Sequence, residues 1–210
     1  MNRAPYEDAE FDKEIYQIFR DFFNLAEKKR RWSLEHDIPW DKCSKNLNPA
    51  IADLVESFCA VELFLPDYLS SMLPGLRSSR GAAWFMCNWG YEESKHSLAL
   101  GDWLLKSGMR TDEQFDDVQR MCVQHEWKPP MDSPLGMACY TTAQELATAI
   151  SYRRLAAHFT PQDDPCLHRL LELITIDERA HFGFYRKMVA LHLRYDRRGT
   201  LEQLRRVLNN

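Results

Sequence analysis

The sequence predicts an all-α protein with a single globular domain. Its 210 residues include only 8 glycines, and no segment alternates apolar and polar residues as a half-buried strand does. Long stretches instead repeat apolar residues at intervals of three and four, which is the spacing of one helical face. Because 45% of the residues are hydrophobic, the chain is long enough for one sizeable core and short for two, and we expect one domain over residues 1–210.

Charge and cysteine usage argue against several classes of function. The formal net charge is −4 and the lysine and arginine doublets are scattered, so nothing favours a nucleic acid as a partner. The 6 cysteines form no C-x-x-C motif and no close pair, and there is neither a signal peptide nor an apolar run of membrane-spanning length. We therefore expect a reduced, soluble, cytoplasmic protein without a membrane span.

The first expected helix covers residues 8–31. It ends in the basic run Lys28–Arg31, which we interpret as a solvated helix C-terminus, where the helix dipole favours cations. Residues 32–47, with Pro39 among them, should form a loop. The apolar face of this helix is formed by Phe11, Ile15, Phe19 and Phe22.

The second expected helix begins at Asn48 and Pro49, which form an N-cap and first-turn pair. It should run to about Ser71. Pro66, four residues after Glu62, lacks a backbone donor and predicts a kink in this helix just below Glu62. A Leu-Pro-Gly turn at residues 73–75 should end it.

Further helices follow, each with a start or stop signal. The helix expected over residues 78–106 is followed by Ser-Gly, a helix stop. A capping box, Thr-Asp-Glu-Gln, opens a short helix over 111–125. Long helices over 133–158 and 165–195 begin at Ser-Pro and Asp-Pro pairs, and a short amphipathic helix around 201–208 closes the chain.

The pattern Glu-x-x-His occurs twice, as Glu93 with His96 and as Glu178 with His181. Each pair lies in the middle of an apolar seam, where an ionisable group needs a partner to be tolerated. The seams are formed by Met86, Trp89, Leu100 and Trp103 around the first pair, and by Leu167, Leu171, Ile174, Tyr185 and Met188 around the second.

A single glutamate precedes each motif by a similar interval. Glu62 lies 31 residues before Glu93, and Glu145 lies 33 residues before Glu178. This interval is one helix, a turn and the return along an antiparallel neighbour, so each single glutamate should lie level with its motif. Two such hairpins facing each other have the ligand pattern of a ferritin-like di-iron or di-manganese four-helix bundle, here with additional short helices and a metal-binding core over about 48–195. The expected metal ligands are Glu62, Glu93, His96, Glu145, Glu178 and His181.

Charge balance predicts the cofactor. Four buried carboxylates would be costly if unpaired, and no lysine or arginine lies on these seams, so two divalent cations are expected. Carboxylate and imidazole ligands without thiolate favour two iron ions, cycling between Fe2+ and Fe3+, with manganese as the alternative. Zinc would leave the redox capacity of such a site unused.

The chain resembles the soluble acyl-carrier-protein desaturases from about Trp32 to Leu193. Ribonucleotide reductase small subunits, multicomponent monooxygenases and rubrerythrins share the metal motifs, whereas Leu-Pro after Glu62, Thr148 and the Trp32 loop favour the desaturases. The resemblance is carried by Glu62-Leu-Phe-Leu-Pro-Asp-Tyr68, Glu92–His96, Glu145–Thr148, Asp177–His181 and Trp32 with Pro39 seven residues later.

The resemblance implies roles that spacing alone does not give. It places Thr148 beside the di-iron centre, in oxygen activation and proton delivery. It makes Asp177 and Trp32 part of a link to a metal-bound histidine, proposed as an electron route.

The spacing of residues on each helix adds an expectation about the histidines. A ligating imidazole needs an acceptor for its second ring nitrogen. Asp177 precedes His181 by four residues and suits this purpose, and Glu92 has the same relation to His96.

The expected function is O2-dependent di-iron oxidoreduction that desaturates an acyl group tethered to acyl carrier protein. Two alternatives remain, hydroxylation or N-oxygenation of a small metabolite and ferritin-like iron oxidation and storage. Because no nucleotide, flavin or iron-sulfur motif is present, electrons should come from a separate ferredoxin-type donor. We expect a homodimer whose basic residues at Lys28–Arg31, Arg153 and Arg154 recognise an acidic carrier.

Overall fold

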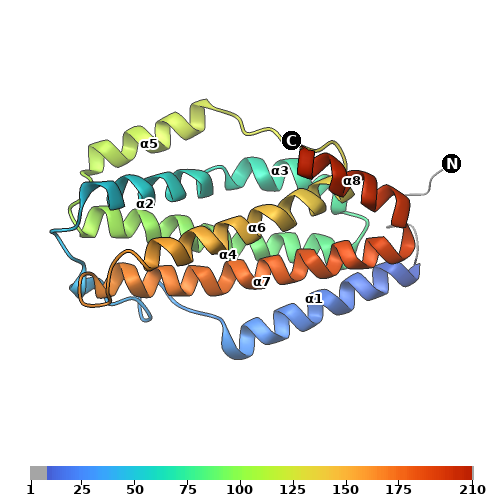
Figure 1. Ribbon diagram of the computed structural model, residues 1–210, viewed down its shortest axis with the longest axis horizontal. Coiled ribbons are helices and arrows are strands. Elements are labelled where there is room, and N and C mark those ends of the chain that lie inside the picture. Colours follow the sequence, from blue (N-terminus) through green and yellow to red (C-terminus); the bar gives the residue numbers. More distant parts are fainter. Residues whose placement is uncertain (1–8, 210) are drawn as a thin grey trace.

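A computed structural model describes residues 9–209, which form helices and connecting loops without any strand. Figure 1 shows the arrangement. The α-helices are α1 (Ala9–Lys29), α2 (Pro49–Glu62), α3 (Leu65–Leu76), α4 (Arg80–Lys106), α5 (Asp112–Gln124), α6 (Pro134–Ala156), α7 (Pro165–Tyr195) and α8 (Arg197–Asn209), with one 3-10 turn, η2 (Trp40–Lys42).

Four long helical units form an elongated bundle (Figure 1). The units are α4, α6, α7 and the consecutive helices α2 and α3. Helix α1 packs along α4 and α7, α5 covers part of α2 and α4, and α8 lies against α6 and α7 at one end. The prediction of an all-α, ferritin-like bundle with additional short helices is confirmed. In the part of the chain described, no helix is both long and apolar enough to cross a membrane.

The predicted helix starts are confirmed by side-chain caps. The Asn48 side chain accepts from the Ala50 backbone N–H at 3.0 Å. Asp164 accepts from the backbone N–H of Leu167 at 2.9 Å. The capping box opens α5 as predicted, with both of its reciprocal hydrogen bonds formed. The first helix was predicted from Asp8, which lies outside the described residues.

The second predicted helix is in fact two helices. It is interrupted just after Glu62, where a kink was predicted, whereas the predicted turn at residues 73–75 is wrong. The chain breaks immediately after Glu62, and Pro66 lies in the first turn of α3, where its missing N–H is not needed. The Tyr68 hydroxyl donates to the Val61 carbonyl at 2.8 Å across the break. Pro74 lies within α3 rather than in a turn. Its missing N–H leaves the Ser70 carbonyl without a helical partner, and the helix tolerates this because Ser70 is exposed and its carbonyl can bond to water.

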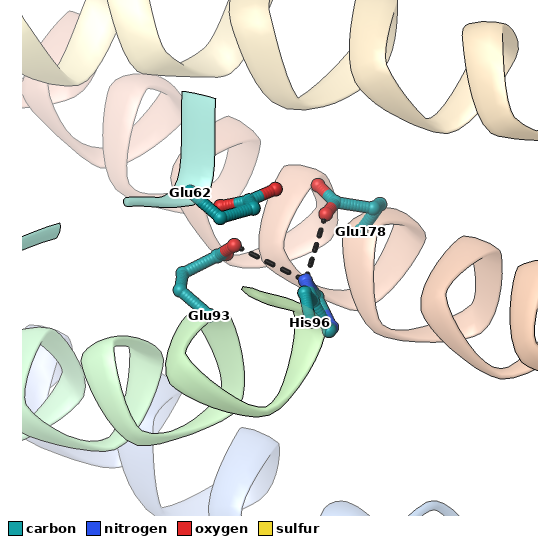
Figure 2. Close-up of side chains that lie close together, drawn as sticks. All are labelled: Glu62, Glu93, His96 and Glu178. Carbon is teal, nitrogen blue, oxygen red and sulfur yellow. Dashed lines mark hydrogen bonds and ion pairs between the residues drawn. The ribbon is translucent and has the colours of Figure 1, made fainter. Parts of the chain in front are cut away.

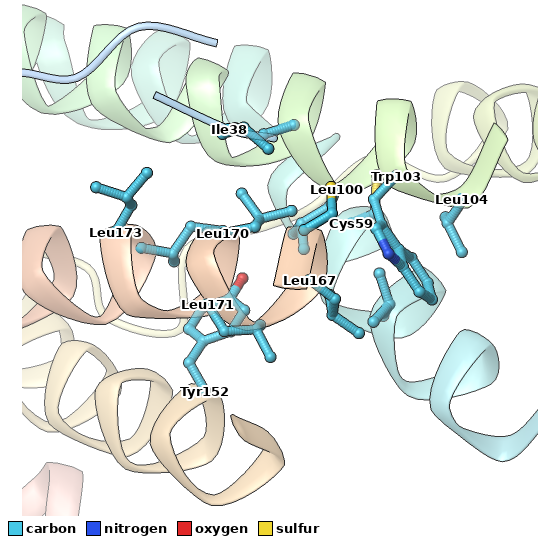
Figure 3. Close-up of a cluster of buried hydrophobic side chains, with 14 of the residues drawn as sticks. Ile38, Cys59, Leu100, Trp103, Leu104, Tyr152, Leu167, Leu170, Leu171 and Leu173 are labelled. Carbon is cyan, nitrogen blue, oxygen red and sulfur yellow. The ribbon is translucent and has the colours of Figure 1, made fainter. Parts of the chain in front are cut away.

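Two apolar clusters lie on either side of the Glu-x-x-His motifs along the bundle. One cluster includes Phe85, Met86 and Trp89, which precede the α4 motif. The other, shown in Figure 3, includes Leu100 and Trp103, which follow it. Full burial of each such side chain contributes about 1.5–3 kcal/mol, so rigid packing at both ends fixes the polar middle.

Helix α1 approaches α4 closely at Gly81. A Cβ at this position would lie 2.5 Å from the backbone nitrogen of Tyr16, so only glycine fits without a shift of one helix. This contact holds the N-terminal half of α1 against the start of α4.

Candidate metal centre

The six predicted metal ligands meet in the middle of the bundle, and all are buried. Each contributes a nitrogen or oxygen to a group whose ligand atoms lie within 4.8 Å of one another. Glu93 and Glu178 belong to both groups and therefore lie where two neighbouring cations could share them. The groups are Glu62, Glu93, His96 and Glu178, drawn in Figure 2, and Glu93, Glu145, Glu178 and His181.

The first group is arranged around the Nδ1 atom of His96. This atom lies 3.1 Å from Glu93 Oε2 and 3.1 Å from Glu178 Oε1 (Figure 2). Glu62 reaches the group from the last residue of α2, and the Tyr152 hydroxyl donates to Glu62 Oε1 at 3.3 Å. The helix break after Glu62 therefore frees the end of α2 to present this carboxylate.

The second group is arranged around the Nδ1 atom of His181. This atom lies 2.9 Å from Glu93 Oε1 and 3.5 Å from Glu145 Oε2. The Trp89 indole N–H donates to the other Glu145 oxygen at 2.9 Å. The two groups thus have matching donor sets, as the internal repetition of the sequence predicts.

The second nitrogen of each histidine bonds to the opposite helix. His181 Nε2 lies 2.7 Å from Glu92 on α4, and His96 Nε2 lies 3.3 Å from Asp177 on α7. The predicted pairing within one helix is therefore wrong. The observed pairs have the register of antiparallel helices, in which the residue before each shared glutamate faces the partner motif's histidine.

A shell of donors surrounds these two outer carboxylates. Arg30 bonds Glu92 at 2.9 and 3.0 Å and also bonds Asp177. Arg31 bonds Glu92 as well, and the Trp32 indole N–H donates to Asp177 Oδ2 at 2.7 Å. The structure therefore brings Trp32, Asp177 and His96 into one hydrogen-bonded chain, as the resemblance implies.

The basic run at the end of α1 corrects the prediction of a solvated helix end. Lys28 and Lys29 are exposed, whereas the Arg30 side chain is only 7% exposed and Arg31 is partly buried. The two arginines are paired with the site, because they follow the last helical residue and turn toward α4 and α7.

The charges of this region indicate what the inner cavity can hold. The outer carboxylates, Glu92 and Asp177, are balanced by the Arg30 and Arg31 guanidiniums that contact them. The four inner glutamates have no lysine or arginine contact among the ion pairs of the described residues. Two divalent cations would neutralise these four carboxylates.

Two of the inner carboxyls, Glu62 and Glu178, have raised pKa values, whereas His96 and His181 lower the pKa of Glu93 despite its burial. Burial and the nearby Glu93 and Glu178 carboxylates raise the pKa of Glu62 well above its ordinary value. Burial and repulsion from Glu93 and Glu145 do the same to the pKa of Glu178. Burial opposes charge on His96 and His181, but the Glu93 carboxylate raises both of their pKa values. Any proton on these groups must leave when they bind a metal, so metal binding is coupled to proton release.

The hydrogen bonds of the site leave room for a metal. Glu93 Oε1, Glu178 Oε1 and His181 Nδ1 are buried and form no hydrogen bond of acceptable geometry. These atoms face the centre of the two groups, and each is a donor atom that divalent metals use. The residues present therefore fit a pair of divalent ions, which the donor set would hold through four carboxylates and two imidazoles.

Thr148 lies beside the inner groups but belongs to neither. Its hydroxyl donates to the Gln144 carbonyl at 2.9 Å, and the half-buried side chain lines a groove of about 430 Å³. Glu62 and Tyr152 lie in the same groove. The groove therefore places Thr148 on the open side of the inner carboxylates.

An apolar cavity of about 250 Å³ lies between α3, α4, α6 and α7. Two of its lining residues, Thr141 and Tyr185, stand one helical turn from Glu145 and His181. The outer wall is rich in methionine, whose flexible side chain adapts to irregular apolar ligands. The methionines are Met72, Met86, Met131, Met137 and Met188.

Comparison with known proteins decides which family carries this arrangement. The fatty acid desaturase family matches residues 42–210, which is most of the chain. The chain belongs to this family. Membership confirms the resemblance drawn from the metal motifs and from Leu-Pro after Glu62.

Named relatives come from plants and from a bacterium. An acyl-[acyl-carrier-protein] desaturase 3 of Oryza sativa subsp. indica is 30% identical over 135 residues, which cover 60% of this chain and 34% of the rice protein. The stearoyl-[acyl-carrier-protein] 9-desaturase of Elaeis guineensis var. tenera is 30% identical over 145 residues, 65% of this chain and 37% of that protein. A Mycobacterium tuberculosis acyl-[acyl-carrier-protein] desaturase is 24% identical over 155 residues, 70% and 45% of the two chains. The chain spans about a third of the length of the plant relatives it matches.

Three functional neighbours of the site are not evident from spacing. Arg30 stands in a basic run that gives no sign of burial. Trp89 and Tyr152 lie on apolar seams, where an aromatic residue is ordinary core, yet their N–H and O–H groups donate to Glu145 and Glu62. Trp89 and Tyr152 could have been found from the sequence, because each is an aromatic residue with a polar tip on a seam, one turn or more from a predicted ligand.

Proposed function

We propose that the protein is an O2-dependent di-iron oxidoreductase that desaturates an acyl group tethered to acyl carrier protein. The observation that carries the proposal is the pair of four-residue groups that share Glu93 and Glu178 and adjoin an apolar cavity. When bound, two iron ions would supply oxygen activation and the oxidising equivalents for C–H cleavage.

The two hollows beside the site define a path for an extended apolar substrate. The groove and the cavity follow one another along α3 and α6, since Tyr68 lines the groove and Met72, one turn later, lines the cavity. Gln144 and Thr141 have the same relation on α6. We infer that an acyl chain enters by the groove and ends in the cavity, so that its middle lies beside the inner carboxylates.

The residues around the path have distinct roles in the proposal. Thr148 lines the groove, and its hydroxyl can rotate from the Gln144 carbonyl to move a proton at Oγ1 during turnover. The apolar wall of the cavity excludes water from the acyl chain. Tyr152 orients Glu62, and Trp89 orients Glu145.

Electrons are proposed to arrive from a separate ferredoxin-type protein through Trp32, Asp177 and His96. These three residues are joined by hydrogen bonds and are buried. Exposed basic residues remain available to attract an acidic carrier or donor. They are Lys28 and Lys29 on α1 and Arg153 and Arg154 on α6, and we keep the expectation of a homodimer as part of this proposal.

Product analysis tests the proposed function. The protein is loaded anaerobically with Fe2+, reduced by a ferredoxin system and given O2 with carrier-bound acyl groups of several lengths. We expect a monounsaturated acyl product that depends on the carrier. Conversion of a free acid or amine to a hydroxylated or N-oxygenated product, without any carrier-dependent desaturation, would replace the proposal with the small-metabolite alternative. Formation of a large iron-filled assembly without organic product would favour storage.

A further inference from the structure

Arg30 contacts one carboxylate on each of the two helices that carry the Glu-x-x-His motifs. Its guanidinium bonds both oxygens of Glu92 on α4, at 2.9 and 3.0 Å, and also bonds Asp177 on α7. Its side chain is only 7% exposed. One cation therefore joins the two halves of the bundle directly behind the predicted metal ligands.

The position of Arg30 is set by the packing of α1. Its backbone N–H bonds the Ala26 carbonyl at 2.8 Å, which continues the hydrogen-bonding pattern of α1 by one residue. The guanidinium lies 4.8 Å from the ring centroid of Phe22, and the Phe22 ring lies 6.3 Å from that of His181. The close contact at Gly81 holds α1 against α4. The planar guanidinium of Arg30 thus lies between the Phe22 ring and the carboxylates of Glu92 and Asp177.

Each of the two carboxylates that Arg30 holds is the acceptor for a ligand histidine. Glu92 lies 2.7 Å from His181 Nε2, and Asp177 lies 3.3 Å from His96 Nε2. A proton kept on each outer nitrogen leaves the lone pair on the inner Nδ1, which faces the shared glutamates. The orientation of both imidazoles therefore depends on where these two acceptors are held.

We propose that Arg30 is a positioning residue for the metal centre, holding Glu92 and Asp177 so that both ligand histidines present Nδ1 to the metals together. The inference rests on the proposed metal centre. A lysine could not replace the arginine fully, because its ammonium is a point charge, whereas the guanidinium presents several donors in one rigid plane. The two metal positions are thereby coupled through a residue that touches neither.

The test compares Co2+ binding by the wild-type protein, Arg30→Met and the matched control Lys29→Met. Arg30→Met keeps the buried stem and removes the fork, while Lys29 is the exposed neighbour in the same run. Loss of an outer partner of a metal ligand typically weakens metal binding 10–100-fold, and we expect a loss of about this size at both Co2+ positions in Arg30→Met. The visible Co2+ spectrum should change with it, and Lys29→Met should match the wild type.

Arg30→Lys keeps a positive charge and guards against a folding failure of Arg30→Met. One ammonium should serve one carboxylate well and the other poorly, so the two Co2+ positions should lose affinity unequally. If both Arg30 variants bind two Co2+ ions with wild-type affinity and spectrum, and only their unfolding temperature falls, Arg30 is a structural tie for α1 and the inference is wrong. A wild-type protein that binds no Co2+ would overturn the proposed metal centre first, which separates the two failures.

Discussion

The outer ring nitrogen of His181 lies 2.7 Å from a carboxylate oxygen of Glu92, a residue of the opposite helix. The pKa of Glu92 is lowered despite its burial, because His181 and Arg30 favour the carboxylate. Glu92, the acceptor for the outer ring nitrogen of His181, is therefore an anion, which raises the basicity of the imidazole and fixes its tautomer.

Glu92→Gln tests this relationship. The amide retains the shape of the side chain but loses the charge that holds the His181 proton on Nε2. We expect metal affinity to fall about 10–100-fold, with Co2+ titration as the measurement. Asp102→Asn, an exposed substitution on the same helix, is the control. Unchanged affinity in Glu92→Gln would show that the contact does not orient the histidine.

Metal binding should stabilise the fold more as the pH rises. The raised pKa values of Glu62 and Glu178 favour the metal-free fold below the ordinary carboxyl pKa, and this contribution is lost as the pH rises through the raised values. The raised pKa values of His96 and His181 act in the same direction, since all four groups lose protons to bind metal.

The measurement is the difference in Tm between Co2+-loaded and metal-free protein over about pH 5 to 8. A tenfold gain in affinity is about 1.4 kcal/mol, and each 1 kcal/mol moves the Tm of a domain of this size by about 2–4 °C. A difference that stays level or narrows with rising pH would contradict the assignment of protonated carboxyls to the metal-free site.

The meeting of the six candidate ligands was predictable from the sequence because their pattern combines two regular signals. Glu-x-x-His places both side chains on one helical face, and the apolar seam around each motif puts that face in the core. The hairpin interval then brings Glu62 and Glu145 level with their motifs. These relations depend on helix geometry alone and so survive without knowledge of the tertiary structure.

The surroundings of the ligands depend on how helices are placed against each other. The pairing of Glu92 with His181 follows from the register of α4 against α7, which no local pattern encodes. Burial of Arg30 follows from the packing of α1 against α4 and α7. The interruption after Glu62 was expected as a kink rather than as two helices, because a proline within an apolar run fits a kinked helix and the first turn of a new one equally well.

Leu100→Ala should destabilise the fold through the apolar cluster beside the site. Leu100 is fully buried, and removing its side chain should cost about 2–5 kcal/mol of unfolding free energy. Leu98 lies two residues away on the same helix and is 59% exposed, so Leu98→Ala should change stability by less than about 0.5 kcal/mol. Chemical denaturation of both variants checks the prediction, and equal losses would place the core elsewhere.

In the proposed reaction, Gly75→Leu should shorten the acyl chain that the protein accepts. Gly75 lines the apolar cavity, where an added Cβ would already lie 3.2 Å from Pro134 Cγ, so a larger side chain must extend into the space. We expect the preferred substrate to shift to shorter acyl groups with metal content unchanged. Gly183→Leu, outside both hollows, is the control for the added bulk. An unchanged chain-length profile in Gly75→Leu would mean that the acyl end lies elsewhere.

The central claim is that two metal ions share Glu93 and Glu178. Anaerobic titration of the protein with Fe2+, followed by measurement of bound iron per chain, tests it most directly. The wild type should bind two ions, Glu178→Ala should lose both because it removes a shared ligand, and the exposed control Glu172→Ala should retain both. A wild type that binds fewer than two ions, or a Glu178→Ala variant that still binds two with unchanged affinity, would contradict the account.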